Sequence, residues 1–191
     1  LRQPLEDKVI RISRVYGTYD FPADFMLCAA MNPCPCGHYP DMNRCRCTPA
    51  QVMQYLGRIS QPLLDRLDLC AEVSPVDFEG LSSGRKGEST QTIRERVICA
   101  QDIQRERYKI EGIQFNGELS GAQIEKYCKM EKDARQLLKM AFQNMPFSAR
   151  AYHRILKVAR TIADMEATES IHRHHIAEAL SYRAFDKKYW N

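Results

Sequence analysis

The chain has 191 residues, of which 44% are hydrophobic and 27% are charged, a composition ordinary for a folded globular protein. No apolar run reaches the roughly 18 residues of a membrane-spanning helix, and scattered cysteines are typical of reduced proteins, so we expect a cytoplasmic protein with no membrane partner. Residues 1–89 carry 10 Lys/Arg against 11 Asp/Glu and residues 90–191 carry 18 against 13, a basic bias that suits an anionic partner.

The first expected elements are strands. The β-branched segment Val9–Val15 predicts a short strand, with Tyr19–Phe21 as the second arm of a hairpin. Phe25–Met31 has no charge over seven residues and predicts a strand buried on both faces, as in a parallel sheet. Asn32 ends that segment before Pro33. It is either a turn former or a polar residue at the strand end where open α/β sheets bind ligands.

Four cysteines follow in the pattern Cys-x-Cys, eight residues, Cys-x-Cys: Cys34, Cys36, Cys45 and Cys47. Four thiolates are the ligand set that structural zinc prefers, although spacing by two residues is more usual, and His38 could replace one ligand. Two alternatives stay open, namely reduced cysteines in a flexible loop and two disulfides formed in air. We favour metal over disulfides because the other cysteines resemble those of reduced proteins.

Two helices are expected after the cysteines. Thr48 is a good N-cap, Pro49 suits the first helical position, and Gln51 completes a capping box. The sequence Ser60-Gln61-Pro62 starts a second, short helix by the same logic.

Arg66 follows the second helix and is flanked by Asp65 and Asp68. A surface ion-pair network, which stabilises little, is the alternative to any functional role for this arginine. Leu69–Val73 then predicts a second core strand.

A change of composition marks a domain boundary. Residues 74–89 are rich in Gly, Ser and Pro, as linkers are. We therefore divide the chain into a domain at 1–75 with the cysteine insert at 33–48, a linker at 76–91 and a helical domain at 92–191.

The helical domain is predicted to be a bundle of about four or five helices. One helix spans Thr92–Tyr108, others begin at the caps Ser120 and Ser148, and the last covers Ile171–Phe185. The side chains expected on the inner face of the first of these helices are Ile93, Val97 and Ala100.

Two polar groups near the end of the chain need interpretation: a basic strip of Arg154, Lys157 and Arg160, and a histidine group of His172, His174 and His175. A solvated helix face is favoured for the strip over nucleic-acid contact, because no aromatic residues are interleaved. In the histidine group only His172 and His175 share a helix face and no third ligand is evident. A surface cluster at a helix start is therefore favoured over a metal site.

The order of these motifs resembles a known family. An apolar run ending in Asn32, then Pro-Leu-Leu-Asp-Arg-Leu-Asp at 62–68, is similar to the second half of an AAA+ ATPase core. More narrowly, AAMNPCPCG, RCRCTPAQ and FSARAYHRILKVARTIADME resemble the magnesium-chelatase-related AAA+ ATPases of the ComM type. The resemblance covers nearly the whole chain, and its motifs are specific in combination.

The resemblance implies an α+β, mostly α, chain: a partial AAA+ α/β core followed by an all-helical lid. It implies that Asn32 is the sensor 1 residue, that Arg66 is an arginine finger acting in trans, and that Arg150 is the sensor 2 arginine on an ATP phosphate. It further implies ATP and Mg²⁺ as cofactors, self-assembly into a ring, expected to be a hexamer, and DNA as a partner in branch migration.

Two motifs of an ATPase are missing from the sequence. The nearest glycine-rich candidate, Gly84–Thr90, lacks the Gly-Lys-Ser/Thr ending of a phosphate-binding loop, and no apolar strand ends in Asp-Glu for magnesium. We therefore expect a C-terminal portion that does not hydrolyse ATP alone. Two rival functions remain: a magnesium-chelatase-type ATPase subunit acting on a protein partner, and a non-enzymatic zinc-binding interaction module.

Overall fold

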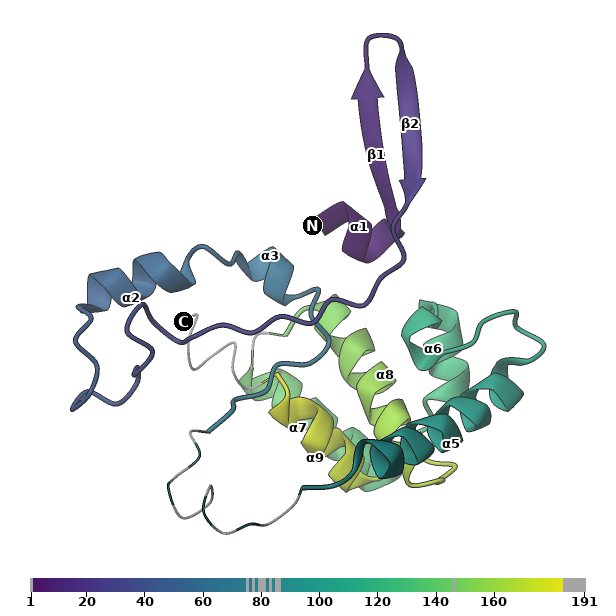
Figure 1. The fold of residues 1–191 in the computed structure, drawn as a ribbon. Coiled ribbons are helices and arrows are strands. Elements are labelled where there is room, and N and C mark those ends of the chain that lie inside the picture. Colours follow the sequence, from purple (N-terminus) through teal and green to yellow (C-terminus); the bar gives the residue numbers. More distant parts are fainter. Residues whose placement is uncertain are drawn as a thin grey trace. The chain divides into compact units, whose positions relative to one another are not determined.

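The computed structural model describes residues 2–74, 76, 78, 82, 84, 87–145 and 147–183. They form two compact units, one running to Leu67 and the other spanning Asp68–Arg183 (Figure 1). Part of the predicted linker and the end of the last predicted helix lie outside the described residues. Helices dominate, and the sheet found in the described part has two strands, which gives an α+β chain. Among the same residues, no helix is both long and apolar enough to cross a membrane.

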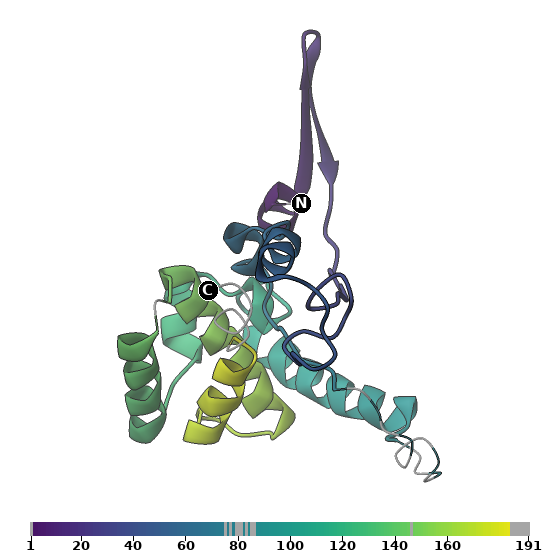
Figure 2. The same cartoon turned by 90° about the vertical axis from the view of Figure 1, so that its left-hand side faces the viewer.

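The first unit begins with α1 (Arg2–Asp7) and a hairpin of β1 (Val9–Arg14) and β2 (Gly17–Pro22). The strands pair antiparallel along their full length, which confirms the predicted hairpin. Both faces of the strands are largely exposed, and Figure 2 shows a ribbon that extends away from α1. The hairpin is therefore held by its hydrogen-bond ladder and cross-strand pairs, not by burial.

The predicted buried strands are wrong. Phe25–Met31 is extended but pairs with no strand in the described residues, and Met26 is 92% exposed. Leu69–Val73 is also unpaired as a strand, with Val73 89% exposed. A strand buried on both faces needs hydrogen-bonded neighbours along its edges and helices over its faces. The described residues supply neither, so these apolar runs remain uncovered.

Both helices predicted after the cysteines are confirmed, as α2 (Pro49–Leu56) and α3 (Gln61–Leu64). The capping box at the start of α2 is formed in both directions. The Thr48 hydroxyl accepts from the Gln51 amide at 3.3 Å, and the Gln51 side-chain oxygen accepts from the Thr48 amide at 2.9 Å. These bonds fix where the chain enters α2, directly after the last cysteine.

A small core anchors the cysteine loop to α2. Its buried members are Cys34, Val52 and Leu56, and the partly buried residues around them are Tyr39, Cys45, Cys47 and Tyr55. Three cysteines thus share one apolar cluster with the helix, so α2 positions the loop.

The second unit is helical. Its described elements are α5 (Thr90–Tyr108), the 3₁₀ helix η1 (Asn116–Glu118), α6 (Gly121–Tyr127), α7 (Lys132–Asn144), α8 (Ala149–Met165) and α9 (Arg173–Ser181). The predicted caps are confirmed, because the side chains of Ser120 and Ser148 each accept from the backbone amide three residues on. The core is built around α8, which contacts α5, η1, α6 and α9.

The packing of α5 differs from the prediction. Ala100 is buried, but Ile93 and Val97 are 43% and 41% exposed. Among the described residues, burial on this helix is confined to its second half, at Ala100, Gln104 and Tyr108. Helical periodicity therefore predicted the helix α5 but not which of its turns are buried.

A buried polar network centres on Asp164 of α8. Its fully buried carboxylate accepts hydrogen bonds from Arg107 at 3.0 Å, Arg160 at 3.1 Å and Asn116 at 2.8 Å. Arg160 also donates to two backbone carbonyls in the loop after α8. The assignment of Arg160 to a solvated strip is therefore wrong, since it is 1% exposed. A buried arginine is tolerated here because its charge and its donors are satisfied.

Replacing Asp164 with alanine is expected to lower the free energy of unfolding by about 3–5 kcal/mol, because it leaves buried guanidinium charge uncompensated. Asp102→Ala is the matched control. It removes an exposed ion pair with Arg105, and such pairs contribute about 0.2–1 kcal/mol. Urea unfolding followed by circular dichroism measures both. Equal, small losses would show that the network does not stabilise the unit.

Candidate functional site

The four clustered cysteines converge on one point. The Sγ atom of Cys34 lies 3.4 Å from that of Cys36 and 3.8 Å from that of Cys45, and the Cys36 and Cys45 sulfurs are 3.6 Å apart. Together with Cys47, all four sulfurs lie within 4.8 Å of one another. All four are free thiols in the structure, so the disulfide alternative is not the arrangement seen.

Two tight turns bring the cysteine pairs together. In the first, the Gly37 amide donates to the Cys34 carbonyl at 3.0 Å, and Gly37 has a φ of +81°, which favours glycine. In the second, the amides of Arg44 and Cys45 donate to the Asp41 carbonyl at 3.1 and 2.8 Å. The sequence between the pairs therefore serves to fold the loop back on itself.

Backbone amides of the loop favour the ionised form of one thiol in the cluster, that of Cys36. Those of His38 and Arg46 lower the pKa of Cys36 to about 6. The amide of Cys47 favours the Cys45 thiolate, but desolvation and the neighbouring thiols outweigh it and raise the pKa of Cys45 to about 12. Four thiols this close cannot all ionise unless a cation joins them.

The donor set suits one particular kind of cation. Four sulfurs around a common centre match the tetrahedral coordination of structural zinc, and the amides that point at the sulfurs are the outer-shell partners that thiolate ligands need. One of these is the Tyr39 amide, which donates to the Cys34 sulfur at 3.4 Å. The sequence suggested His38 as a substitute ligand, but His38 is not part of the cluster that the four cysteines form.

Asn32, expected as sensor 1, lies at the entrance of the cysteine loop. It is exposed, and a Cβ at Gly37 would lie 3.7 Å from its side-chain nitrogen. It follows an extended segment, not a buried strand, within the described residues. Its expected role therefore remains a prediction.

Arg66, expected as the arginine finger, is held within the first unit. Its guanidinium pairs with Glu6 at 2.7 Å and also donates to the Pro62 carbonyl, and its side chain is only 9% exposed. The sequence also suggested a surface ion-pair network with the flanking aspartates. The structure corrects this alternative, because Arg66 pairs with Glu6. The Nε atom is buried and has no acceptor in the described part of the chain.

Arg150, expected as sensor 2, occupies the first turn of α8 in the second unit and is exposed. Ser148 caps this helix by accepting from the Ala151 amide at 3.2 Å. The helix N-terminus favours an anion near Arg150, as the prediction requires.

The histidine group is arranged differently from the expectation of a surface cluster. His175 is fully buried, and Glu166 supplies a third polar group, with its Oε2 2.9 Å from Nε2 of both His174 and His175. The His172 amide donates to Nδ1 of His175 at 3.0 Å, so the proton of a neutral His175 ring sits on Nε2 and points at Glu166. A nitrogen that donates in this way does not offer a lone pair to a metal, and the group is better explained as a hydrogen-bond network between the buried His175 and the exposed Glu166 and His174.

Sequence reasoning missed two carboxylates, Glu6 and Glu166. The first lies 60 residues from Arg66, and the second precedes the histidines by eight and nine residues. In each case the carboxylate and its partner lie in or beside different helices, so no periodic signal within one helix or strand pointed to either.

Comparison with known families gives a match in each part of the chain. Residues 1–81 match the family described as magnesium chelatase, subunit ChlI, and residues 87–183 match the one described as magnesium chelatase, subunit ChlI C-terminal. The chain belongs to this magnesium-chelatase-related family.

Particular relatives agree. The chain is 45% identical to the protein YifB of Salmonella typhimurium over 189 residues, which is 98% of this chain and 36% of the relative. It is also 45% identical to competence protein ComM of Haemophilus influenzae over 185 residues, 96% of this chain and 35% of that protein. The chain therefore spans about a third of the length of the curated relatives it matches. The resemblance inferred from the motifs is confirmed.

Proposed function

We propose that this chain is part of a ring-forming AAA+ ATPase that couples ATP hydrolysis to the movement of DNA strands or the migration of DNA branches. The observation that carries the proposal is the family membership over both units, with one similar relative named as a competence protein. In this proposal the ring is a hexamer and the cofactors are ATP and Mg²⁺.

Within such a ring, each expected residue has a distinct task. Asn32 positions the attacking water near the nucleotide, and Arg150 contacts a phosphate of the same subunit from the helix start of α8. Arg66 contacts the nucleotide of the neighbouring subunit, where a guanidinium fork stabilises charge that develops on the transferred phosphoryl group.

We further propose that Cys34, Cys36, Cys45 and Cys47 hold one structural zinc ion. The support is the convergence of four sulfurs within 4.8 Å on a loop whose amides point at them. Zinc bound there would cross-link the two turns, and a loop with so small an apolar core would otherwise lack a strong stabilising contact.

The test of the ATPase proposal compares the 191-residue chain with the full-length protein. The chain should release no phosphate, because its sequence carries no Gly-Lys-Ser/Thr loop. The full-length protein should turn over ATP at about 1 s⁻¹ or faster, within the ordinary range for enzymes.

Adding branched DNA separates the rival functions. Stimulation of hydrolysis by a four-way junction supports the DNA motor. Hydrolysis that ignores DNA but responds to a protein partner would favour a chelatase-type subunit. An inactive full-length protein that still binds zinc would favour the interaction module.

A further inference from the structure

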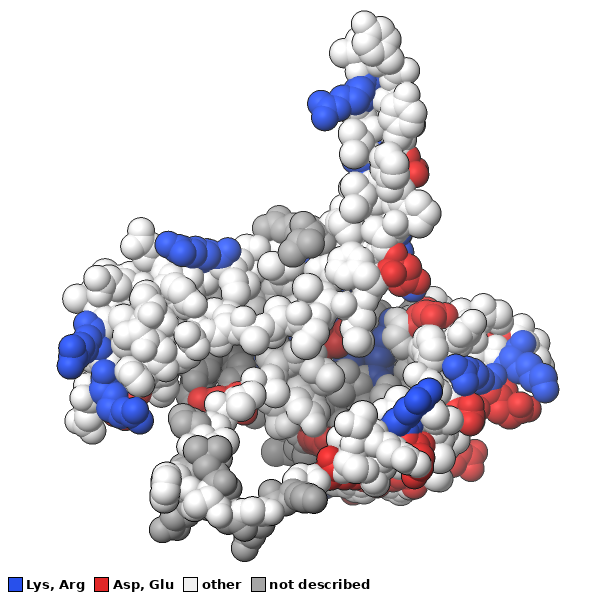
Figure 3. All heavy atoms as spheres, viewed as in Figure 1, with Lys and Arg blue, Asp and Glu red and all other residues white. Residues whose placement is uncertain are grey.

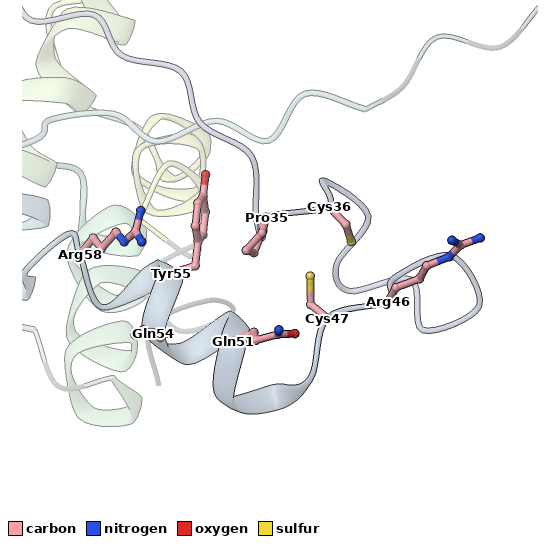
Figure 4. A pocket seen from close by; sticks show the side chains of 8 residues that line it. All are labelled: Pro35, Cys36, Arg46, Cys47, Gln51, Gln54, Tyr55 and Arg58. Atoms are coloured by element: carbon pink, nitrogen blue, oxygen red, sulfur yellow. The ribbon is translucent and has the colours of Figure 1, made fainter.

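A hollow beside the cysteine loop combines features that suit a strand of nucleic acid. It has a volume of about 300 Å³ and lies between the loop and α2. The residues that line it are Pro35, Cys36, Arg46, Cys47, Gln51, Gln54, Tyr55 and Arg58. Figure 4 shows them in a row, with Arg58 and Tyr55 at one end, Pro35 and the two cysteines in the middle, and Arg46 at the other end.

The charged side chains along this row are positive and are not paired with described acidic residues. Arg46 and Arg58 are exposed, and neither side chain has an ion pair or hydrogen bond to another described residue. No acidic residue lines the hollow. Residues 32–64 contain a single acid, Asp41, and blue side chains mark the outer edge of the α2 region in Figure 3.

The row also offers groups for a base. Tyr55 is half-buried: it packs against the core formed by Cys34 and Val52 and also lines the hollow. A ring held by such packing is a rigid stacking surface. Gln51 uses its side-chain oxygen to cap α2, which leaves its NH₂ group free to donate to a base or a sugar.

The basic strip predicted on α8 lacks these features. On α8, Arg154 pairs with Asp68, Lys157 donates to the Gly117 carbonyl, and Arg160 is buried. Each of these cations already has a partner, and none of them lines the hollow beside α8 that Phe142 and Tyr152 help to form. The row beside the cysteine loop is therefore the better candidate for a nucleic-acid contact.

We propose that this row binds single-stranded DNA, with Arg46 and Arg58 on phosphates at its two ends and Tyr55 stacked on a base of the same strand. The inference rests on the proposed action on DNA and deepens it by assigning a contact surface. Cationic groups that track the backbone, combined with an aromatic platform, are the usual means of binding a single strand without sequence preference. The fold of the cysteine loop sets the distance between the two arginines, so an intact loop is a condition of binding.

The test measures binding of the 191-residue chain to a fluorescein-labelled oligothymidylate of about 16 nucleotides, the upper site size of a small single-strand-binding fold. Fluorescence anisotropy is recorded across a series of salt concentrations. Each phosphate contact to a single strand contributes about −0.7 to the slope of log K against log salt. The double variant Arg46→Ala/Arg58→Ala should therefore flatten the slope by about 1.4 and weaken binding about 25-fold at 0.1 M salt.

Arg44→Ala is the matched control. Arg44 lies on the same loop, next to Cys45, and is exposed. Its side chain has no described partner and does not line the hollow. It should leave both affinity and slope close to those of the native chain. Tyr55→Leu keeps an apolar side chain against the core and should weaken binding about fivefold or more at unchanged slope. Thermal melting and zinc content of each variant report whether the loop is intact.

Equal losses in Arg44→Ala and in the double variant would overturn the proposal, because only overall charge would matter. Failure of the native chain to bind the oligonucleotide, or a preference for duplex over single strand, would overturn it as well. Neither result decides the proposed function, since stimulation of full-length ATP hydrolysis by a four-way junction is measured independently.

Discussion

Replacing Arg66 with alanine in the full-length protein is expected to lower ATP turnover by a factor of roughly 10³–10⁵ and to leave nucleotide binding largely intact. Binding is expected to depend mainly on the phosphate-binding loop of the same subunit. In the proposed ring, the transition state is expected to need additional positive charge from the neighbouring subunit. Turnover is measured by phosphate release, and binding by titration with a fluorescent ATP analogue.

The structure adds a requirement to this prediction. Arg66 is paired with Glu6 at 2.7 Å and is 9% exposed, so it must leave that pair to reach a neighbouring nucleotide. Arg66→Lys is the informative companion variant, because lysine keeps the charge beside Glu6 but loses the planar fork. We expect it to be stable and nearly inactive. If Arg66→Ala loses nucleotide affinity or unfolds, and Arg66→Lys retains turnover, Arg66 is a structural residue only.

The second large effect is expected at the cysteine cluster. The native chain should bind about one zinc ion, and Cys34→Ser should weaken zinc binding by more than roughly 100-fold, which is the upper range for loss of a mere outer-shell partner. Cys34 is the fully buried member, with its sulfur within 3.8 Å of those of Cys36 and Cys45. Its replacement removes one of the four grouped sulfur ligands.

Cys28→Ser is the control, because Cys28 is exposed and outside the cluster. Zinc is quantified by elemental analysis of protein prepared without chelator, and affinity by competition with a chelator of known strength. Acidification should release the metal, since thiolates must take up protons to do so. Metal-free native protein with all eight thiols reacting freely would contradict the site.

The features that the sequence predicted correctly depend on contacts between residues close together in the chain. The caps at Thr48, Ser120 and Ser148 depend on hydrogen bonds between residues three apart, so the sequence alone identified them and the structure confirms them. The hairpin of β1 and β2 is likewise a contact between neighbours in sequence. The cysteine spacing predicted the cluster because two short turns are enough to join the pairs.

Contacts between residues far apart in the chain were not predicted from the sequence. The partner of Arg66 lies 60 residues away, and Arg107 reaches Asp164 across 57 residues. Arg160 was expected on a polar strip, yet it is buried. Its partner Asp164 is only four residues away, but Asp164 also binds the distant Arg107 and Asn116 in the same buried network. Phe25–Met31 shows the reverse case: its apolar pattern is real, but burial needs neighbouring strands and helices that the described residues do not contain.

A mixing experiment tests the central claim, a ring in which one subunit completes the catalytic site of the next, most directly. Full-length Arg66→Ala subunits are combined with subunits that lack the lysine of the phosphate-binding loop but keep Arg66, and phosphate release is measured against each variant alone. We predict that the mixture regains turnover, because intact phosphate-binding loops then face intact arginines across some interfaces. A mixture as inactive as its two components would contradict the trans role of Arg66.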